Sequence, residues 1–294
     1  MGACLPQMLQ AQTPTDALMM PKGKICVAVS YTYDAWDEYW EGTLKRTNGN
    51  IGTFSREIVM PMFALGLTDR INLIAGLPWM RTQASGGQMA GVTGLQDAGL
   101  WLKVRALEAQ AGPGKAGLYI TAGGTLPATN YLADYMPFSL GLGCPDGSLR
   151  GIFKYELDNG LYLRAQAGYQ LRGTTPIERY YFYTTQGIYS DQVDMPDAIT
   201  WGGALGGWLL GRHLQAELVY DVLDTRGGFD IRRQDMPFPS NEMDFSRAGV
   251  FLHYYLPFQG LGVTASASQV LTGRNVGQSR QYAGGLTWQF GIWE

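Results

Sequence analysis

One stretch near the middle of the chain alternates apolar and polar side chains over twelve residues, and it restricts the fold more than any other feature. The stretch is GLYLRAQAGYQLRG, residues 160–173. A strict period of two places alternate side chains on opposite faces of a β-strand. The run is about twice as long as an ordinary globular strand and close to the roughly 9–11 residues of a tilted membrane strand. The pattern therefore predicts a strand that crosses a lipid bilayer, with its apolar face toward lipid.

Similar alternation divides the rest of the chain into segments of comparable length. The segments are residues 24–36, 53–67, 71–83, 95–107, 116–127, 147–157, 161–173, 197–210, 214–225, 243–256, 261–272 and 281–292. Short connections at 68–70, 108–116, 158–160, 211–213 and 257–260 alternate with long ones at 37–52, 84–94, 128–146, 174–196, 226–242 and 273–280. Short turns at one end, long loops at the other and an even strand number are typical of bacterial outer-membrane barrels.

We therefore expect an all-β fold, a single antiparallel transmembrane β-barrel of about 12 strands with short periplasmic turns and long extracellular loops. A further hairpin within residues 174–196 would raise the strand number to 14. The strand at 53–67 stays ambiguous in its facing, because both of its faces are apolar and Pro61 lies within it. A soluble antiparallel barrel is the alternative, and it would need polar outward faces.

Aromatic residues at the ends of the apolar faces provide an independent indication of a membrane barrel. Two girdles of aromatic side chains mark the two membrane–water interfaces of such barrels. The predicted long-loop girdle comprises Tyr31, Tyr33, Tyr169, Trp201 and Tyr220, and the short-turn girdle comprises Tyr155, Tyr254, Trp288 and Phe290. The last strand, QYAGGLTWQFGIWE, also resembles the C-terminal signal that the outer-membrane assembly machinery recognises, although Glu294 follows the final aromatic residue.

Composition excludes several other classes of protein. Charged residues make up 16% of the 294 residues and the net charge is −3, so a nucleic-acid partner is not expected. No uncharged apolar run reaches the roughly 18 residues of a membrane helix. We expect a multi-pass barrel in the cell outer membrane of a Gram-negative bacterium, in contact with outer-membrane lipid and lipopolysaccharide.

The N-terminal stretch MGACLPQMLQAQTPTDALMM has no basic leader, yet LQAQ resembles the end of a signal peptide with cleavage after Ala11. We expect residues 1–20 to be the remnant of an export signal or a disordered N-terminus, and residues 21–294 to form the barrel. A lipid-modified Cys4 is the alternative.

Residues that could support catalysis or metal binding are sparse. Cys4, Cys26 and Cys144 lie far apart and form no cluster with histidine, so no metal site, cofactor or disulfide framework is expected. Ser246 and His253 share a strand, but seven positions correspond to more than about 20 Å. The sequence therefore predicts no catalytic residues, and we expect that the protein is not an enzyme.

Polar side chains on the inward faces are the candidate lumen residues. They are Asp97, Trp101, Lys103, Arg105, Arg150, Lys154, Glu156, Arg164, Arg172, Glu217, Asp221 and His253. Buried charges need partners, so these groups either satisfy one another in a polar core or line a selective conduit. Barrels of about eight strands are filled by side chains, whereas those of 16–18 strands hold a channel. A narrow path is therefore compatible with this chain, and a wide porin is not.

Three long loops repeat an acidic-Met-Pro element, in DYMPF at 134–138, VDMPD at 193–197 and QDMPF at 234–238. The candidate loop residues are Met136, Phe138, Met195, Met236 and Phe238. Such side chains either meet a hydrophobic ligand or partner or close over the barrel mouth.

The segments FALGLTDRINLIAGLPWM, residues 63–80, and GLQDAGLWLKVRAL, residues 94–107, resemble the meta-pathway phenol-degradation family of outer-membrane proteins. The matching positions are Gly66, Leu67, Thr68, Asp69, Arg70, Pro78, Asp97, Gly99 and Lys103, while Gln96 stands where the family commonly has glycine. The resemblance implies passive uptake of small hydrophobic or aromatic compounds. The alternative is a structural barrel that anchors protein partners in a larger cell-envelope complex.

Overall fold

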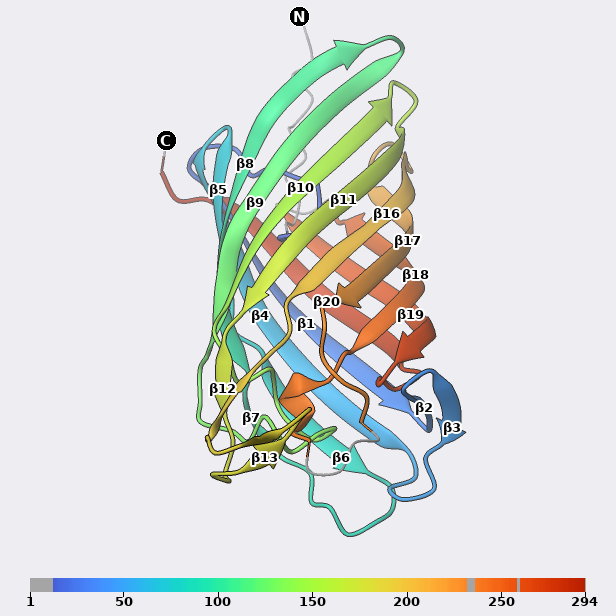
Figure 1. Cartoon of the computed structure of the whole chain (residues 1–294). Coiled ribbons are helices and arrows are strands. Elements are labelled where there is room, and N and C mark those ends of the chain that lie inside the picture. Colours follow the sequence, from blue (N-terminus) through green and yellow to red (C-terminus); the bar gives the residue numbers. More distant parts are fainter. Residues whose placement is uncertain (1–12, 232–235, 258–259, 294) are drawn as a thin grey trace, which may run out of the picture.

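The computed structural model describes residues 13–231, 236–257 and 260–293, and these residues form a closed antiparallel β-barrel (Figure 1). The first strand pairs with the last and with the next wall strand, which closes the sheet. The wall is formed by β1 (Lys24–Trp36), β4 (Phe54–Thr68), β5 (Ile71–Gly76), β6 (Trp79–Ala84), β7 (Thr93–Leu95), β8 (Asp97–Ala111), β9 (Gly114–Pro127), β10 (Asp146–Leu157), β11 (Leu161–Arg172), β16 (Ala198–Leu209), β17 (Leu214–Thr225), β18 (Asp244–Tyr255), β19 (Leu261–Arg274) and β20 (Arg280–Gly291).

Two of the wall strands are interrupted, so these fourteen segments form twelve strands of the barrel. β5 and β6 pair with successive parts of β4, on either side of Leu77 and Pro78. β8 and β7 pair with β5 and β6 in the same way, on either side of Gln96. Proline has no N–H to donate to a sheet, but the Pro78 carbonyl still accepts the Gln96 N–H at 2.8 Å. The predicted number of 12 strands is confirmed.

Residues 174–196 do contain hairpins, but these lie outside the barrel wall. β12 (Thr174–Pro176) pairs only with β15 (Gln192–Asp194), and β13 (Phe182–Tyr183) only with β14 (Gly187–Ile188). β2 (Glu38–Glu41) and β3 (Leu44–Thr47) form another small hairpin in a long loop. The alternative of 14 barrel strands is therefore wrong.

The predicted connection at residues 108–116 is also wrong, because most of it is strand. β8 continues to Ala111 and β9 begins at Gly114, so only Gly112 and Pro113 form the turn. Gly112 has a φ of 57°, which glycine adopts without a steric penalty. In Figure 1 this β8–β9 hairpin extends beyond the other short turns.

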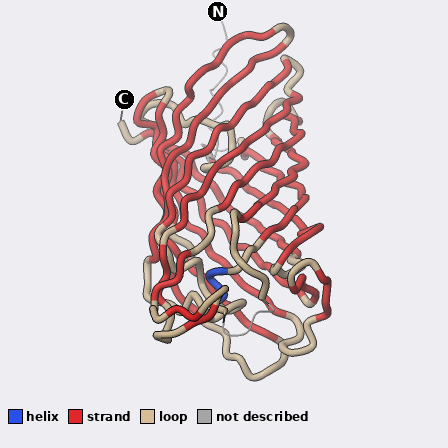
Figure 2. Tube along the Cα trace, in the orientation of Figure 1, coloured by secondary structure: helices blue, strands red, loops and turns tan. Residues whose placement is uncertain are grey.

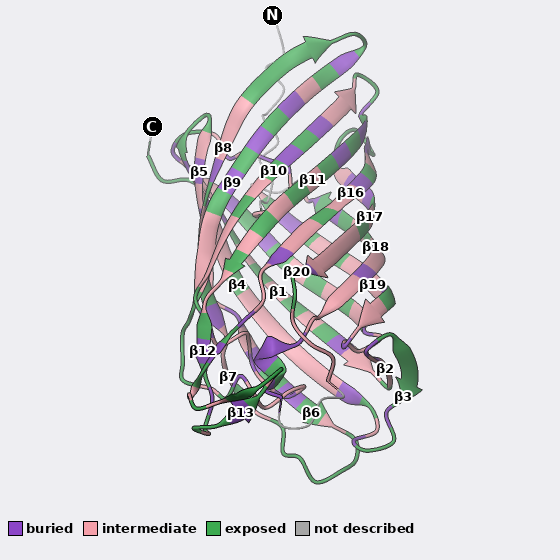
Figure 3. Cartoon of the chain, viewed as in Figure 1, coloured by how far each residue is buried: buried purple, intermediate pink, exposed green. Residues whose placement is uncertain are grey.

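The barrel exterior is apolar. Exposed and less exposed residues alternate along the strands in Figure 3, as the period of two requires. Leu163 is 48% exposed and Leu218 is 63% exposed, although both are large apolar side chains. The outward side chains of Tyr31, Trp201 and Trp288 are likewise exposed. An exterior of this composition, with aromatic side chains at its ends, is suited to lipid.

Helical structure is almost absent from the described residues, as Figure 2 shows. It consists of the 3-10 turn η1 (Phe238–Ser240) in a long loop. No helix in the described part of the chain could span a membrane.

The facing of β4, which the sequence left ambiguous, is explained by the residues that lie inside the barrel. Tyr31 donates a hydrogen bond to Glu57, so Glu57 faces outward with its neighbour on β1. The inward face of β4 carries Met62 and Ala64, which pack against Met20 from the segment before β1. Both faces of this strand are therefore apolar because one contacts lipid and the other contacts a chain segment in the lumen.

Candidate functional site

The segment of residues 13–23 lies inside the barrel and contacts widely separated parts of its wall. Leu18 packs against Tyr162, Trp208 and Tyr255, on β11, β16 and β18. Ala17 packs against side chains of β9 and β10. Met20 packs against side chains of β1, β4 and β5. We call residues 13–23 the lumen segment, and it crosses the barrel interior near the short turns.

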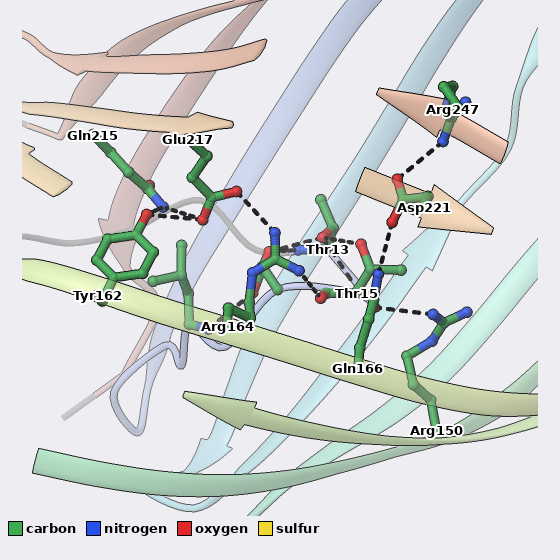
Figure 4. Close-up of polar contacts among 12 residues, drawn as sticks. Thr13, Thr15, Arg150, Tyr162, Arg164, Gln166, Gln215, Glu217, Asp221 and Arg247 are labelled. Carbon is green, nitrogen blue, oxygen red and sulfur yellow. Dashed lines mark hydrogen bonds and ion pairs between the residues drawn. The ribbon is translucent and has the colours of Figure 1, made fainter. Parts of the chain in front are cut away.

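Polar contacts hold the lumen segment in place. Lys103 is fully buried, and its Nζ donates to Oδ1 and to the backbone oxygen of Asp16, each at 2.8 Å. Arg164 donates to the Thr15 carbonyl at 2.8 Å (Figure 4). The Asn72 side chain accepts from the Met20 N–H at 3.2 Å and donates to the Met20 carbonyl at 3.0 Å. The buried cation Lys103 thus obtains the partner that burial requires.

This role of the N-terminal stretch was not predicted from the sequence, although Asp69 in the turn after β4 and Gly66 near the end of β4 both contact it. The Asp69 carboxylate accepts from the Lys22 N–H at 3.0 Å. A Cβ at Gly66 would lie 2.0 Å from the Pro21 carbonyl oxygen, so only glycine admits the segment there. The expected cleavage after Ala11 and the alternative lipidation of Cys4 fall outside the described residues.

Deep in the lumen, Arg164 and Glu217 form an ion pair at 2.8 Å, with both side chains buried. The Tyr162 hydroxyl donates to Glu217 at 2.8 Å, and Gln215 donates to the Tyr162 oxygen at 2.7 Å (Figure 4). A buried pair is tolerated when further hydrogen bonds satisfy its remaining atoms.

Nearer the long loops, a chain of contacts follows the wall from β10 to β20. Arg150 donates to Gln166 at 3.0 Å, and Gln166 donates to Asp221 at 3.1 Å. Arg247 donates to Asp221 at 3.3 Å and to Gln281 at 3.0 Å. Figure 4 shows Arg150, Gln166, Asp221 and Arg247 reaching toward one another from different strands. Asp221 therefore meets two neighbours from strands on either side.

The other candidate lumen residues mostly have partners close to their own strands. Lys154 pairs with Glu156 at 2.7 Å, and Glu156 also pairs with Arg212. Arg105 pairs with Glu108 at 3.2 Å. Three further residues complete the set. Asp97 accepts from Tyr131 and from the Leu142 N–H, and Arg172 donates to Gln170 and the Pro196 carbonyl. Trp101 packs against the cluster that contains Met20.

His253 and Ser246 have separate partners. His253 lies with its Nε2 3.2 Å from the Thr287 hydroxyl and stacks on Tyr255, whereas the Ser246 hydroxyl lies 2.7 Å from that of Thr272. These contacts do not form a catalytic pair. In the described part of the chain, no group of three or more His, Cys, Asp or Glu side chains is placed to hold a metal ion.

Two cavities lie in series within the barrel. The inner cavity, of about 360 Å³, is bounded by Thr13, Asp16 and Leu18 of the lumen segment and is also lined by Glu217 and His253. The outer cavity, of about 530 Å³, lies under the long loops. Arg247 and Gln281 line both cavities, so their hydrogen-bonded pair marks the junction.

The candidate loop residues lie around the outer cavity or within the loops that cover it. Met136 and Phe238 line the cavity. Phe138 is 0% exposed and packs edge-on against Phe54, with ring centroids 5.4 Å apart. Met195 and Met236 are buried. The loops therefore fold over the barrel mouth and contribute apolar side chains to the cavity wall.

Comparisons with known proteins show the fold. No family model and no curated protein matches the sequence. The barrel is similar to the COG4313 outer membrane channel from Pseudomonas putida F1, with a TM-score of 0.75 and 13% identity over 95% of this chain and 100% of that chain. The translocator domain of autotransporter NalP from Neisseria meningitidis matches with a TM-score of 0.49 and 11% identity over 92% of this chain and 89% of its own.

The fold is therefore that of an outer-membrane barrel. Together with the closed wall and the apolar exterior, this confirms the predicted fold class and the location as a multi-pass barrel in the outer membrane.

Proposed function

We propose that the protein is a passive channel for small hydrophobic or aromatic compounds. The observation that carries this proposal is the pair of cavities in series, the outer of which is lined by Trp36, Tyr39, Phe54, Phe238 and Phe245. Apolar and aromatic walls with a few placed polar groups are typical of sites for small organic molecules. The resemblance of residues 63–80 and 94–107 to the meta-pathway phenol-degradation family supports the same class of compound.

The route begins at the loops, passes the Arg247–Gln281 junction and ends at the lumen segment. This segment is held by hydrogen bonds, ion pairs and packing, so its displacement breaks no covalent bond. We propose that displacement of the lumen segment opens the inner cavity toward the periplasm. Lipid and lipopolysaccharide surround the barrel in this proposal, and protein partners are not required.

The test uses N-phenyl-1-naphthylamine, a hydrophobic dye that fluoresces in the membrane after it passes the lipopolysaccharide barrier. Ser266 lines the inner cavity, so Ser266→Trp should fill it and lower dye uptake by intact cells toward that of cells without the barrel. Ala265 lies next to it on the exposed face, and Ala265→Trp should leave uptake unchanged. Equal uptake by wild type and Ser266→Trp would contradict passage through the lumen and favour the structural-barrel alternative.

A further inference from the structure

The described residues that line the outer cavity include three arginines and no acidic side chain. These arginines are Arg56, Arg172 and Arg247. Two of these cations are paired with acids behind the wall, Arg56 with Asp34 and Arg247 with Asp221. Arg172 is the exception.

Arg172 is partly buried and has no ion pair among the described residues. Within the described residues, no carboxylate lies within 4.0 Å of its guanidinium nitrogens, which donate only to the Pro196 carbonyl and to Gln170, each at 3.3 Å. Its Nε is buried and has no hydrogen-bond partner. The nearby Asp197 carboxylate is engaged by the Arg172 backbone N–H and by Tyr169, each at 2.8 Å. A partly buried cation in this situation favours an anionic ligand.

A second unpartnered donor lines the same cavity. Asn48 is 8% exposed, and its Nδ2 is buried without an acceptor, while its Oδ1 accepts from the Ile51 N–H at 3.5 Å. Asn48 and Arg172 both line the cavity, and each has one buried donor atom without an acceptor. Most buried polar groups are satisfied, so these two side chains favour a ligand that accepts hydrogen bonds. A carboxylate has two acceptor oxygens and matches the planar fork of a guanidinium.

The remaining walls are suited to a ring. Trp36 and Phe54 lie with ring centroids 5.3 Å apart on one part of the wall. Arg247 lies over Phe245, 5.7 Å from the ring centroid, on another part. Aromatic ligands gain stabilisation from offset or edge contacts with such side chains.

We infer that the outer cavity binds aromatic monocarboxylates, with the carboxylate on Arg172 and Asn48 and the ring against the aromatic wall. Among the described residues that line the cavity, Arg172 is the one cation without an ion pair, and it matches the single charge of a monocarboxylate. This inference rests on the proposed function, because it identifies the compounds that enter the channel most readily.

The test is isothermal titration of the full-length folded barrel in detergent with benzoate, benzyl alcohol and acetate. We expect benzoate to bind at least about tenfold more tightly than either of the other two, as one charge-assisted contact corresponds to a tenfold change or more. Arg172→Gln should remove this preference. Asn48→Asp keeps an oxygen that can accept the Ile51 N–H and places a negative charge in the site. It should therefore weaken the binding of benzoate and leave the binding of benzyl alcohol unchanged.

Arg226→Gln is the matched control, because Arg226 is 50% exposed, pairs with Asp224 and does not line the cavity. Heat-dependent mobility in gel electrophoresis checks that each variant is folded. Equal affinity for benzoate and benzyl alcohol would overturn the inference, and so would benzoate affinity that survives both site variants. If acetate bound as tightly as benzoate, the aromatic ring would contribute nothing to affinity, and that part of the inference would be wrong. Dye uptake by cells is measured separately, so the channel proposal can stand even when the carboxylate inference fails.

Discussion

At the scale of single residues, alternation in the sequence placed the charged side chains on the inner face, but it did not give their partners. Arg164 and Glu217 are 53 positions apart and meet because the intervening strand sets their register. A shift of one residue in a strand would turn such a side chain to the other face. The pairing of Lys103 with Asp16 was also beyond prediction, because it depends on a segment without strand periodicity.

Cys144 lies in a long loop outside the membrane-spanning strands, where burial raises the pKa of its thiol to about 11. The thiolate is the reactive form, so at pH 8 only about one thiol in a thousand is ionised. In a Cys4→Ser, Cys26→Ser background, we expect Cys144 to react slowly with a water-soluble maleimide and faster as pH rises toward 11. A cysteine introduced by Thr185→Cys, at an exposed loop position, should be labelled completely before Cys144 has reacted to a measurable extent. Equal rates at pH 8 would contradict the closed arrangement of these loops.

At the scale of elements, the strands were largely predictable because most of them have an apolar lipid face and a polar lumen face, β4 being the exception. The interruptions at Pro78 and Gln96 were not predicted, since they depend on how two neighbouring strands bend together. The lumen segment was missed for a different reason. The residues that indicate it most strongly are Asp69 and Gly66, which contact the segment but lie outside it. Both are also ordinary residues for a turn and a strand, so the sequence alone did not show that they contact another part of the chain.

The assignment of side chains to the lipid face or the lumen face of a strand can be tested on β17. Leu218 is 63% exposed on the lipid side, and Leu218→Arg should lower the free energy of unfolding by about 2–4 kcal/mol near the middle of the membrane. The adjacent Val219 lines the inner cavity, so Val219→Arg should cost much less. The measurement is reversible denaturant unfolding in lipid vesicles. Equal losses for the two variants would contradict the assigned register of β17.

At the scale of the whole molecule, the lumen combines the two arrangements that the sequence left open. Its charges satisfy one another at Arg164–Glu217 and Arg247–Asp221, as a polar core requires. The same residues nevertheless border two cavities, because twelve strands enclose more space than their inward side chains fill. The lumen segment occupies part of that space on the short-turn side. Stability and closure therefore depend on the same contacts.

Asp16 connects the lumen segment to Lys103, a buried cation on the barrel wall. Replacing Asp16 therefore tests directly whether the lumen segment closes the barrel on the periplasmic side. In Asp16→Ala, Lys103 loses its ion-pair partner and becomes an unpaired buried cation, which costs about 3–5 kcal/mol unless water enters. We expect the segment to detach and the ion conductance in planar bilayers to rise well above that of wild type. Asp158→Ala, at an exposed short turn, removes the same charge without touching the segment and should leave conductance unchanged. A barrel that is less stable but no more conductive would show that the segment stays in place when its ion pair is lost, and the opening toward the periplasm would then have to lie elsewhere.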